Sequence, residues 1–98
     1  MVKEWIIQCS LRMARKDAAT LWLNLGCQDW RDIIPRITLP ALAIAGRASP
    51  IPWKSIAWIA KQIPGAQLEI FEKNEGGSHF MFLENPTKFN QIVSRFVA

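Results

Sequence analysis

Apolar side chains recur at helical spacing in the first third of the chain. An apolar residue at every fourth position predicts a helix over residues 2–14. A second helix is predicted to begin after Asp17, a favourable N-cap residue, and to end at Gly26, since glycine is common just past the end of a helix. The apolar side of this second helix is formed by Ala18, Leu21, Trp22 and Leu25.

From residue 41 onward, the pattern changes to short strands and helices in alternation. Residues 41–45 form a continuous apolar run closed by a glycine, which is typical of a strand buried on both faces of a parallel sheet. Residues 53–62 have the apolar spacing of a helix, and residues 67–71 alternate polar and apolar side chains, as a strand near a sheet edge does. A last helix is predicted to begin at Pro86, because proline suits the first helical position.

This order of elements predicts the α/β fold class. A strand, a helix and a second strand form a βαβ unit, in which the two strands run parallel. Parallel sheets are stable only when neighbouring strands and helices cover them, so we expect these strands to belong to a larger sheet than this chain supplies. The predicted core consists of Trp22, Ile33, Leu42, Ile44, Ile56, Ile59, Leu68, Ile70, Phe89, Ile92 and Phe96.

The composition is that of one globular domain, since half of the 98 residues are hydrophobic. Twelve Lys and Arg give a formal net charge of +4, but they are scattered, so we expect neither a nucleic-acid partner nor a membrane. Cys9 and Cys27 stand in no closely spaced motif, and the N-terminus does not resemble a signal peptide. We therefore expect two free thiols, a cytoplasmic location, no metal site and no cofactor.

The residues that point to chemistry lie in a glycine-rich loop that holds the single histidine of the chain. His79 follows Gly76, Gly77 and Ser78, soon after the second predicted strand. Loops at the carboxyl ends of parallel strands are where α/β folds place their functional sites. An imidazole there can take a proton from a nucleophile and return it to a leaving group near neutral pH. His79 is therefore predicted to act as general base and then as general acid.

Several segments, taken in order, resemble the C-terminal part of the α/β-hydrolases, in their branch of esterases and haloperoxidases. Residues 37–46 are similar to the penultimate strand of that family, and residues 63–68 to its link into the last strand. The histidine loop and closing helix of the family are matched by Gly76, His79, Glu84, Pro86, Phe89 and Phe96. The resemblance implies that residues 29–98 are the last strand-helix-strand-helix of a hydrolase core, and that residues 1–28 are the end of a cap.

One position departs from the family pattern. The family usually carries an aspartate three residues after the glycine that ends the penultimate strand, where it orients the histidine. This chain has Ser49 at that position, and a hydroxyl can hydrogen-bond to imidazole but brings no charge. Three explanations are open: the acid lies outside this chain at the end of an earlier strand, Asp29 or Asp32 replaces it, or the site is degenerate. We favour the first.

No serine of the chain has the Gly-x-Ser-x-Gly pattern of the family's nucleophile. Without a nucleophile and an oxyanion hole a histidine has nothing to activate, so the chain alone is predicted to be inactive. The resemblance implies that this chain is the C-terminal part of a longer protein, called the parent protein below. It also implies that the parent is a serine-type hydrolase of esters or related small molecules. Trp53 and Phe80 are candidates for contact with the substrate, although packing explains both residues equally well.

Two other functions remain open. Because Ser49 replaces the acid, the parent is alternatively a non-catalytic relative of the hydrolases, serving as a small-molecule receptor or a partner-binding protein. The second alternative is a free-standing basic binding module, which the spread of charge and the hydrolase-like segments disfavour. The expected partners are a small-molecule substrate in the parent and, for this chain, either the N-terminal half of the parent or further copies of itself.

Overall fold

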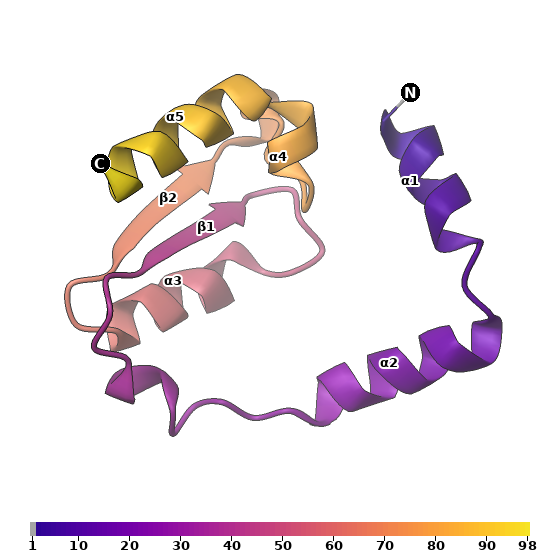
Figure 1. Cartoon of the computed structure of the whole chain (residues 1–98), viewed down its shortest axis with the longest axis horizontal. Helices are drawn as coiled ribbons and strands as arrows, with labels where there is room; N and C mark the ends of the chain where they lie inside the picture. The colour runs from indigo at the N-terminus through magenta and orange to yellow at the C-terminus, as the bar shows by residue number, and fades with distance from the viewer. Residues whose placement is uncertain (1) are drawn as a thin grey trace. The chain divides into compact units, whose positions relative to one another are not determined.

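The computed structural model describes residues 2–98, which fall into two compact units divided between Trp30 and Arg31. The N-terminal unit contains two helices, α1 (Val2–Ser10) and α2 (Arg15–Cys27) (Figure 1). The first predicted helix is therefore shorter than expected, because a turn interrupts it after Ser10. No helix among the described residues is long and apolar enough to cross a membrane.

Both predicted boundaries of α2 are wrong. The helix begins at Arg15, so Asp17 lies in its first turn rather than at its cap, where a carboxylate still interacts favourably with the positive end of the helix. Gly26 lies inside the helix, because the chain leaves α2 through an extended residue and needs no left-handed glycine. The expected apolar side is also not buried, since Trp22 is 70% exposed in the described chain.

The C-terminal unit is a βαβ unit followed by a closing helix. Strand β1 (Leu42–Gly46), helix α3 (Trp53–Gln62), strand β2 (Gln67–Phe71) and helix α5 (Pro86–Val97) follow one another in the chain. The two strands pair in parallel, with Leu42 opposite Gln67 and Gly46 opposite Phe71. Helices α3 and α5 lie on opposite sides of the two strands (Figure 1). The predicted βαβ unit and the α/β class are thus confirmed.

The two faces of β1 differ in the size of their side chains. Leu42 and Ile44 pack against the buried cluster beneath α5, which contains Phe71. Because successive side chains of a strand alternate between faces, Ala43 and Ala45 point toward the α3 side. Ala45 is fully enclosed there, with 3% of its surface exposed. These two alanines, whose β-propensity is low, thus lie on the face that helix α3 covers.

The buried core differs from the predicted core. Its centre is Phe71, which is completely buried and packs with Met81 and Ile92. Of the predicted core residues Ile92 is buried, whereas Ile33 and Leu68 are exposed. The prediction placed the buried face of β2 on the side of Leu68, but the larger core lies on the opposite face, to which Phe71 belongs. The remaining buried apolar residues are Ala45, Ala60 and Ile63.

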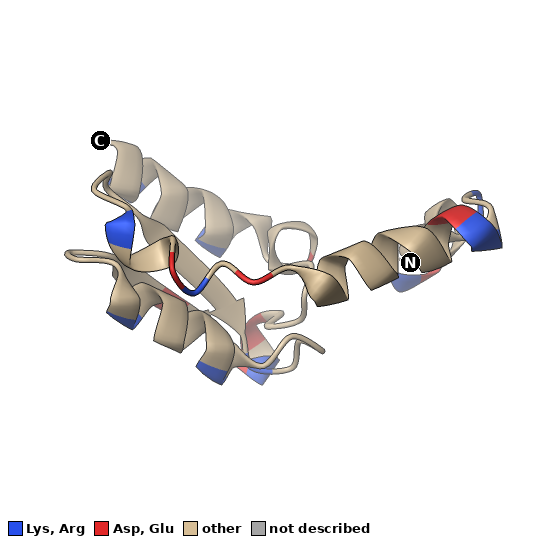
Figure 2. Cartoon of the chain, turned by 90° about the horizontal axis from the view of Figure 1, so that it is seen from below, with Lys and Arg blue, Asp and Glu red and all other residues tan. Residues whose placement is uncertain are grey.

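Short helical turns complete the C-terminal unit. A 3-10 turn, η1 (Ile34–Arg36), precedes β1, and another, η2 (Lys73–Glu75), follows β2. The four-residue helix α4 (Met81–Glu84) was not predicted, and it carries the buried Met81. Helix α5 begins at Pro86 as predicted. Basic and acidic residues are both found along the ribbon of this unit, including Lys and Arg on α3 and α5 (Figure 2).

Candidate active site

The loops after β1 and β2 lie together because the two parallel strands end at the same edge of the sheet. The backbone joins them directly. The N–H of Arg47 donates to the carbonyl of Phe71 at 3.0 Å, and the N–H of Ala48 donates to the carbonyl of Gly77 at 2.8 Å. The chain segment that holds Ser49 is therefore attached, through main-chain atoms, to the segment that holds His79.

Gly46 allows this close approach of the two loops, and Gly77 allows the second loop to fold back onto the end of β2. A Cβ atom on Gly46 would collide with the carbonyl oxygens of Gly77 and Ser78, and one on Gly77 would collide with the carbonyl of Phe71. Gly76 has a different reason to be glycine, because its φ of 73° lies in the left-handed region. The glycine-rich loop thus serves to bring the backbones of the two loops into contact.

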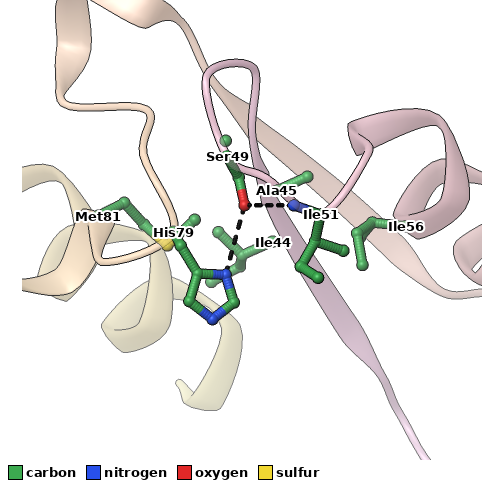
Figure 3. Close-up of a pocket in the computed structure, with 8 residues that line it drawn as sticks. Ile44, Ala45, Ser49, Ile51, Ile56, His79 and Met81 are labelled. Atoms are coloured by element: carbon green, nitrogen blue, oxygen red, sulfur yellow. Dashed lines mark hydrogen bonds between the residues drawn. The ribbon is translucent and has the colours of Figure 1, made fainter. Parts of the chain in front are cut away.

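Ser49 and His79 face each other across this junction. The Ser49 Oγ lies 3.3 Å from the His79 Nδ1, within hydrogen-bond distance (Figure 3). The same hydroxyl oxygen accepts the backbone N–H of Ile51 at 3.1 Å, which fixes its orientation. The second ring nitrogen of His79, Nε2, lies on the side of the ring away from Ser49 (Figure 3). Ser49 is half-buried, whereas His79 is exposed.

This geometry sets what the pair can do. With one lone pair occupied by Ile51, the Ser49 oxygen retains a second lone pair and a proton, so it can accept from or donate to Nδ1. The serine therefore orients the ring without selecting one tautomer, and it adds no negative charge. Nε2 remains available to exchange a proton with a reacting group. His79 can act there as a general base or acid.

Neighbours of His79 hold its loop in place. The Ser78 hydroxyl accepts the backbone N–H of Phe80 at 3.1 Å, so Ser78 is engaged within its own loop. The ring of Phe80 meets the imidazole edge to face, with 5.2 Å between ring centres. Phe80 thus packs against the histidine, and its role as a substrate contact stays a prediction.

An ion pair that sequence reasoning missed braces the Ser49 loop. The Arg47 Nε donates to both carboxylate oxygens of Glu72, at 3.0 and 2.9 Å. The Arg47 guanidinium also lies over the ring of Trp53, with its Cζ 4.3 Å from the ring centre. Arg47 and Glu72 directly follow the paired ends of β1 and β2, so the register of the two strands brings them together, and the sequence pattern did not specify that register.

A second ion pair anchors the His79 loop to α5. The Lys88 Nζ lies 2.7 Å from the Glu75 Oε2, and the backbone N–H of Glu72 donates to the Glu75 Oε1 at 3.1 Å. The side-chain amide of Asn85 donates to the Glu75 carbonyl at 2.9 Å. The hydrogen bond from Lys88 is the main cause that lowers the pKa of the Glu75 carboxyl below its ordinary value of 4.5, and the Glu72 N–H adds to it.

A small pocket of about 120 Å³ opens beside the Ser49–His79 pair. Its apolar wall is formed by Ile44, Ala45, Ile51, Ile56 and Met81, and Gly46 completes the lining (Figure 3). Trp53 and Phe80, the two candidates for substrate contact, are not among its lining residues. No group of three or more potential metal-ligating side chains occurs among the residues that the structure describes.

The chain is similar to two curated proteins. A protein named as the carbamate hydrolase RutD, from Stutzerimonas stutzeri, is 35% identical over an alignment of 103 positions, which covers 92% of this chain and 38% of that protein. The pimeloyl-[acyl-carrier protein] methyl ester esterase of Aeromonas salmonicida is 36% identical over 70 residues, which cover 70% of this chain and 26% of that protein. The chain thus spans less than two fifths of the length of either relative. No family model and no solved structure matches it.

Proposed function

The chain is related to the α/β-hydrolases, to which both curated relatives belong, and we propose that it forms the C-terminal part of a serine-type hydrolase. One observation carries this proposal. Ser49 and His79 meet at the ends of two adjacent parallel strands, with Nδ1 of the imidazole bound and Nε2 free. This is the arrangement in which a histidine transfers protons for a nucleophile.

In the parent enzyme, His79 takes the proton of the nucleophile through Nε2 and then returns it to the leaving group. The nucleophile and the oxyanion hole belong to a part of the parent outside this sequence, because no Gly-x-Ser-x-Gly pattern occurs in it. Residues 29–98 are the end of the hydrolase core in this proposal, and residues 1–28 are the end of its cap. The isolated chain is therefore inactive.

Ser49 occupies the position of the triad acid and orients His79 without supplying charge. The charge that stabilises the imidazolium comes from an acid at the end of an earlier strand of the parent. The substrates belong to a class of small esters or related acyl compounds. This class is supported by the names of the two relatives, a carbamate hydrolase and a methyl ester esterase.

A chimeric enzyme tests the proposal. This chain replaces the segment that it matches in the carbamate hydrolase of Stutzerimonas stutzeri, and hydrolysis of nitrophenyl acetate is measured. We expect the chimera to be active and His79→Ala to lower its rate by roughly 10³-fold or more. The isolated chain and the hydrolase without its matching segment serve as controls and should show background rates. A folded, active chimera that is indifferent to His79→Ala would refute the role of His79.

Ser49 also favours a second candidate function, a non-catalytic relative that binds small molecules or a protein partner. A serine next to Nδ1 cannot supply the charge that supports the imidazolium during turnover. This alternative predicts that the chimera folds but has no turnover when Ser49 and His79 are both unchanged. The same measurement therefore separates the two candidates.

A further inference from the structure

The pocket beside His79 has the size and lining of a subsite for a short chain of carbon atoms. We propose that it binds an unbranched alkyl group of three to four carbons, from the acyl or the alcohol part of a substrate. As a substrate subsite it rests on the hydrolase function proposed above, whereas the binding itself requires only this chain.

The volume limits the ligand. An apolar cavity of about 150 Å³ is large enough to bind benzene, so a pocket of about 120 Å³ holds a somewhat smaller apolar group. Pockets for drug-sized ligands are larger, at about 300–1,000 Å³. An aromatic ring with substituents or a long acyl chain therefore exceeds the space beside His79, whereas a propyl or butyl group fits it.

The lining selects an apolar group. Ile44, Ile51, Ile56 and Met81 present only aliphatic carbon and a thioether to the interior (Figure 3). The polar side chains of the lining are Ser49 and His79, which already bind each other. A ligand with a polar group therefore places its alkyl end against the aliphatic wall and its polar end beside the imidazole.

Ile56 offers a way to alter the pocket from the helix that borders it. Ile56 and Ile59 are both half-buried on α3, but only Ile56 is among the lining residues. Truncating Ile56 lengthens the space available to an alkyl chain, whereas truncating Ile59 removes the same atoms from elsewhere on the helix. Ile59→Ala is thus the matched control. Ile51→Ala gives a second enlargement at an exposed position, where the fold depends less on the side chain.

Nuclear magnetic resonance of the whole 98-residue chain tests the proposal. The probes are primary amides of increasing length, from acetamide to hexanamide, and the signals are those of the single histidine and of the Met81 methyl group. We expect the dissociation constant to fall about four-fold per added methylene, equivalent to about 0.8 kcal/mol. This gain in affinity should stop near butyramide or pentanamide, where the alkyl chain fills the pocket.

The variants decide whether this pocket is the binding site. In Ile56→Ala and Ile51→Ala, the gain should continue for one or two further methylenes, and in Ile59→Ala it should stop at the same length as in the unchanged chain. Affinity that does not depend on chain length, or a limit that Ile59→Ala moves as much as Ile56→Ala, would overturn the proposal. An inactive chimera together with length-dependent binding would refute the hydrolase function and leave the pocket in place.

Discussion

Ser49 and His79 are hydrogen-bonded through Nδ1 of the imidazole, the nitrogen that an aspartate binds in a serine hydrolase triad. The Ser49 hydroxyl is itself fixed by the backbone N–H of Ile51. Ser49 therefore orients the imidazole ring as an aspartate would, but it does not supply the negative charge of an aspartate.

Removing the Ser49 hydroxyl should affect the reaction much less than removing the imidazole. A neutral hydrogen bond contributes about 0.5–1.5 kcal/mol, so Ser49→Ala should lower kcat of the active chimera by about ten-fold or less. His79→Ala should cost roughly 10³-fold or more in the same chimera. Steady-state kinetics of the two variants make the comparison. Equal losses would identify Ser49 as a full triad partner and would contradict an acid elsewhere in the parent.

The contact between the two loops predicts a large effect of a single methyl group. Gly46→Ala places a Cβ against the carbonyls of Gly77 and Ser78, and we expect it to destabilise the chain by about 1–3 kcal/mol through overpacking. Gly26→Ala is the matched control, because no atom lies within 4 Å of its added methyl group. It should raise stability by up to about 1 kcal/mol, since Gly26 is inside a helix. Urea unfolding of both variants gives the two values, and equal stability would refute the steric argument.

The Glu75–Lys88 ion pair predicts a loss of stability in acid. Because the folded state holds the pKa of Glu75 below its ordinary value of 4.5, the contribution of the ionised carboxylate is complete above that pH. It is lost as the pH falls below 4.5 toward the lower pKa of the folded chain. Glu75→Gln should remove this part of the pH dependence of the urea midpoint, and Lys88→Met should weaken it. Glu84→Gln, at an exposed position nearby, controls for the loss of one negative charge.

The free edge of β1 predicts self-association. In the described part of the chain, β1 pairs with β2 alone, so its other edge presents unpaired backbone groups. Exposed apolar side chains such as Trp58 and Leu68 add surface that favours contact. We expect folded chains to associate at micromolar concentration by pairing these edges. Light scattering after size exclusion measures the mass. A monomer with dispersed amide resonances would contradict this expectation and would show that the chain closes its own core.

The sequence patterns predicted the βαβ unit better than the interactions that stabilise it. Helix α3 and strand β2 have the predicted bounds, because periodicity and the flanking Pro and Gly residues are local signals. The relationship to the α/β-hydrolases was also predicted, and the two curated relatives confirm it. The meeting of Ser49 and His79 followed from that family pattern, since the two residues are thirty positions apart.

The two ion pairs were not predicted because they depend on register and loop shape. Arg47 and Glu72 are brought together by the pairing of Gly46 with Phe71, which a sequence alone does not specify. Glu75 and Lys88 meet only after the short helix α4 turns the chain back toward α5. The core was misjudged for a related reason, because alternation identifies two faces of β2 but does not tell which one receives the closing helix.

Because Ala48 and Gly77 are joined by a backbone hydrogen bond, the spacing between Ser49 and His79 does not depend on the side chains around them. Main-chain atoms hold the two loops together, so substitutions along them leave the distance between positions 49 and 79 unchanged as long as Gly46 and Gly77 are kept. An insertion in either loop breaks this link. Related sequences should therefore keep the lengths of these loops constant and vary in residue type at loop positions other than the three glycines and His79.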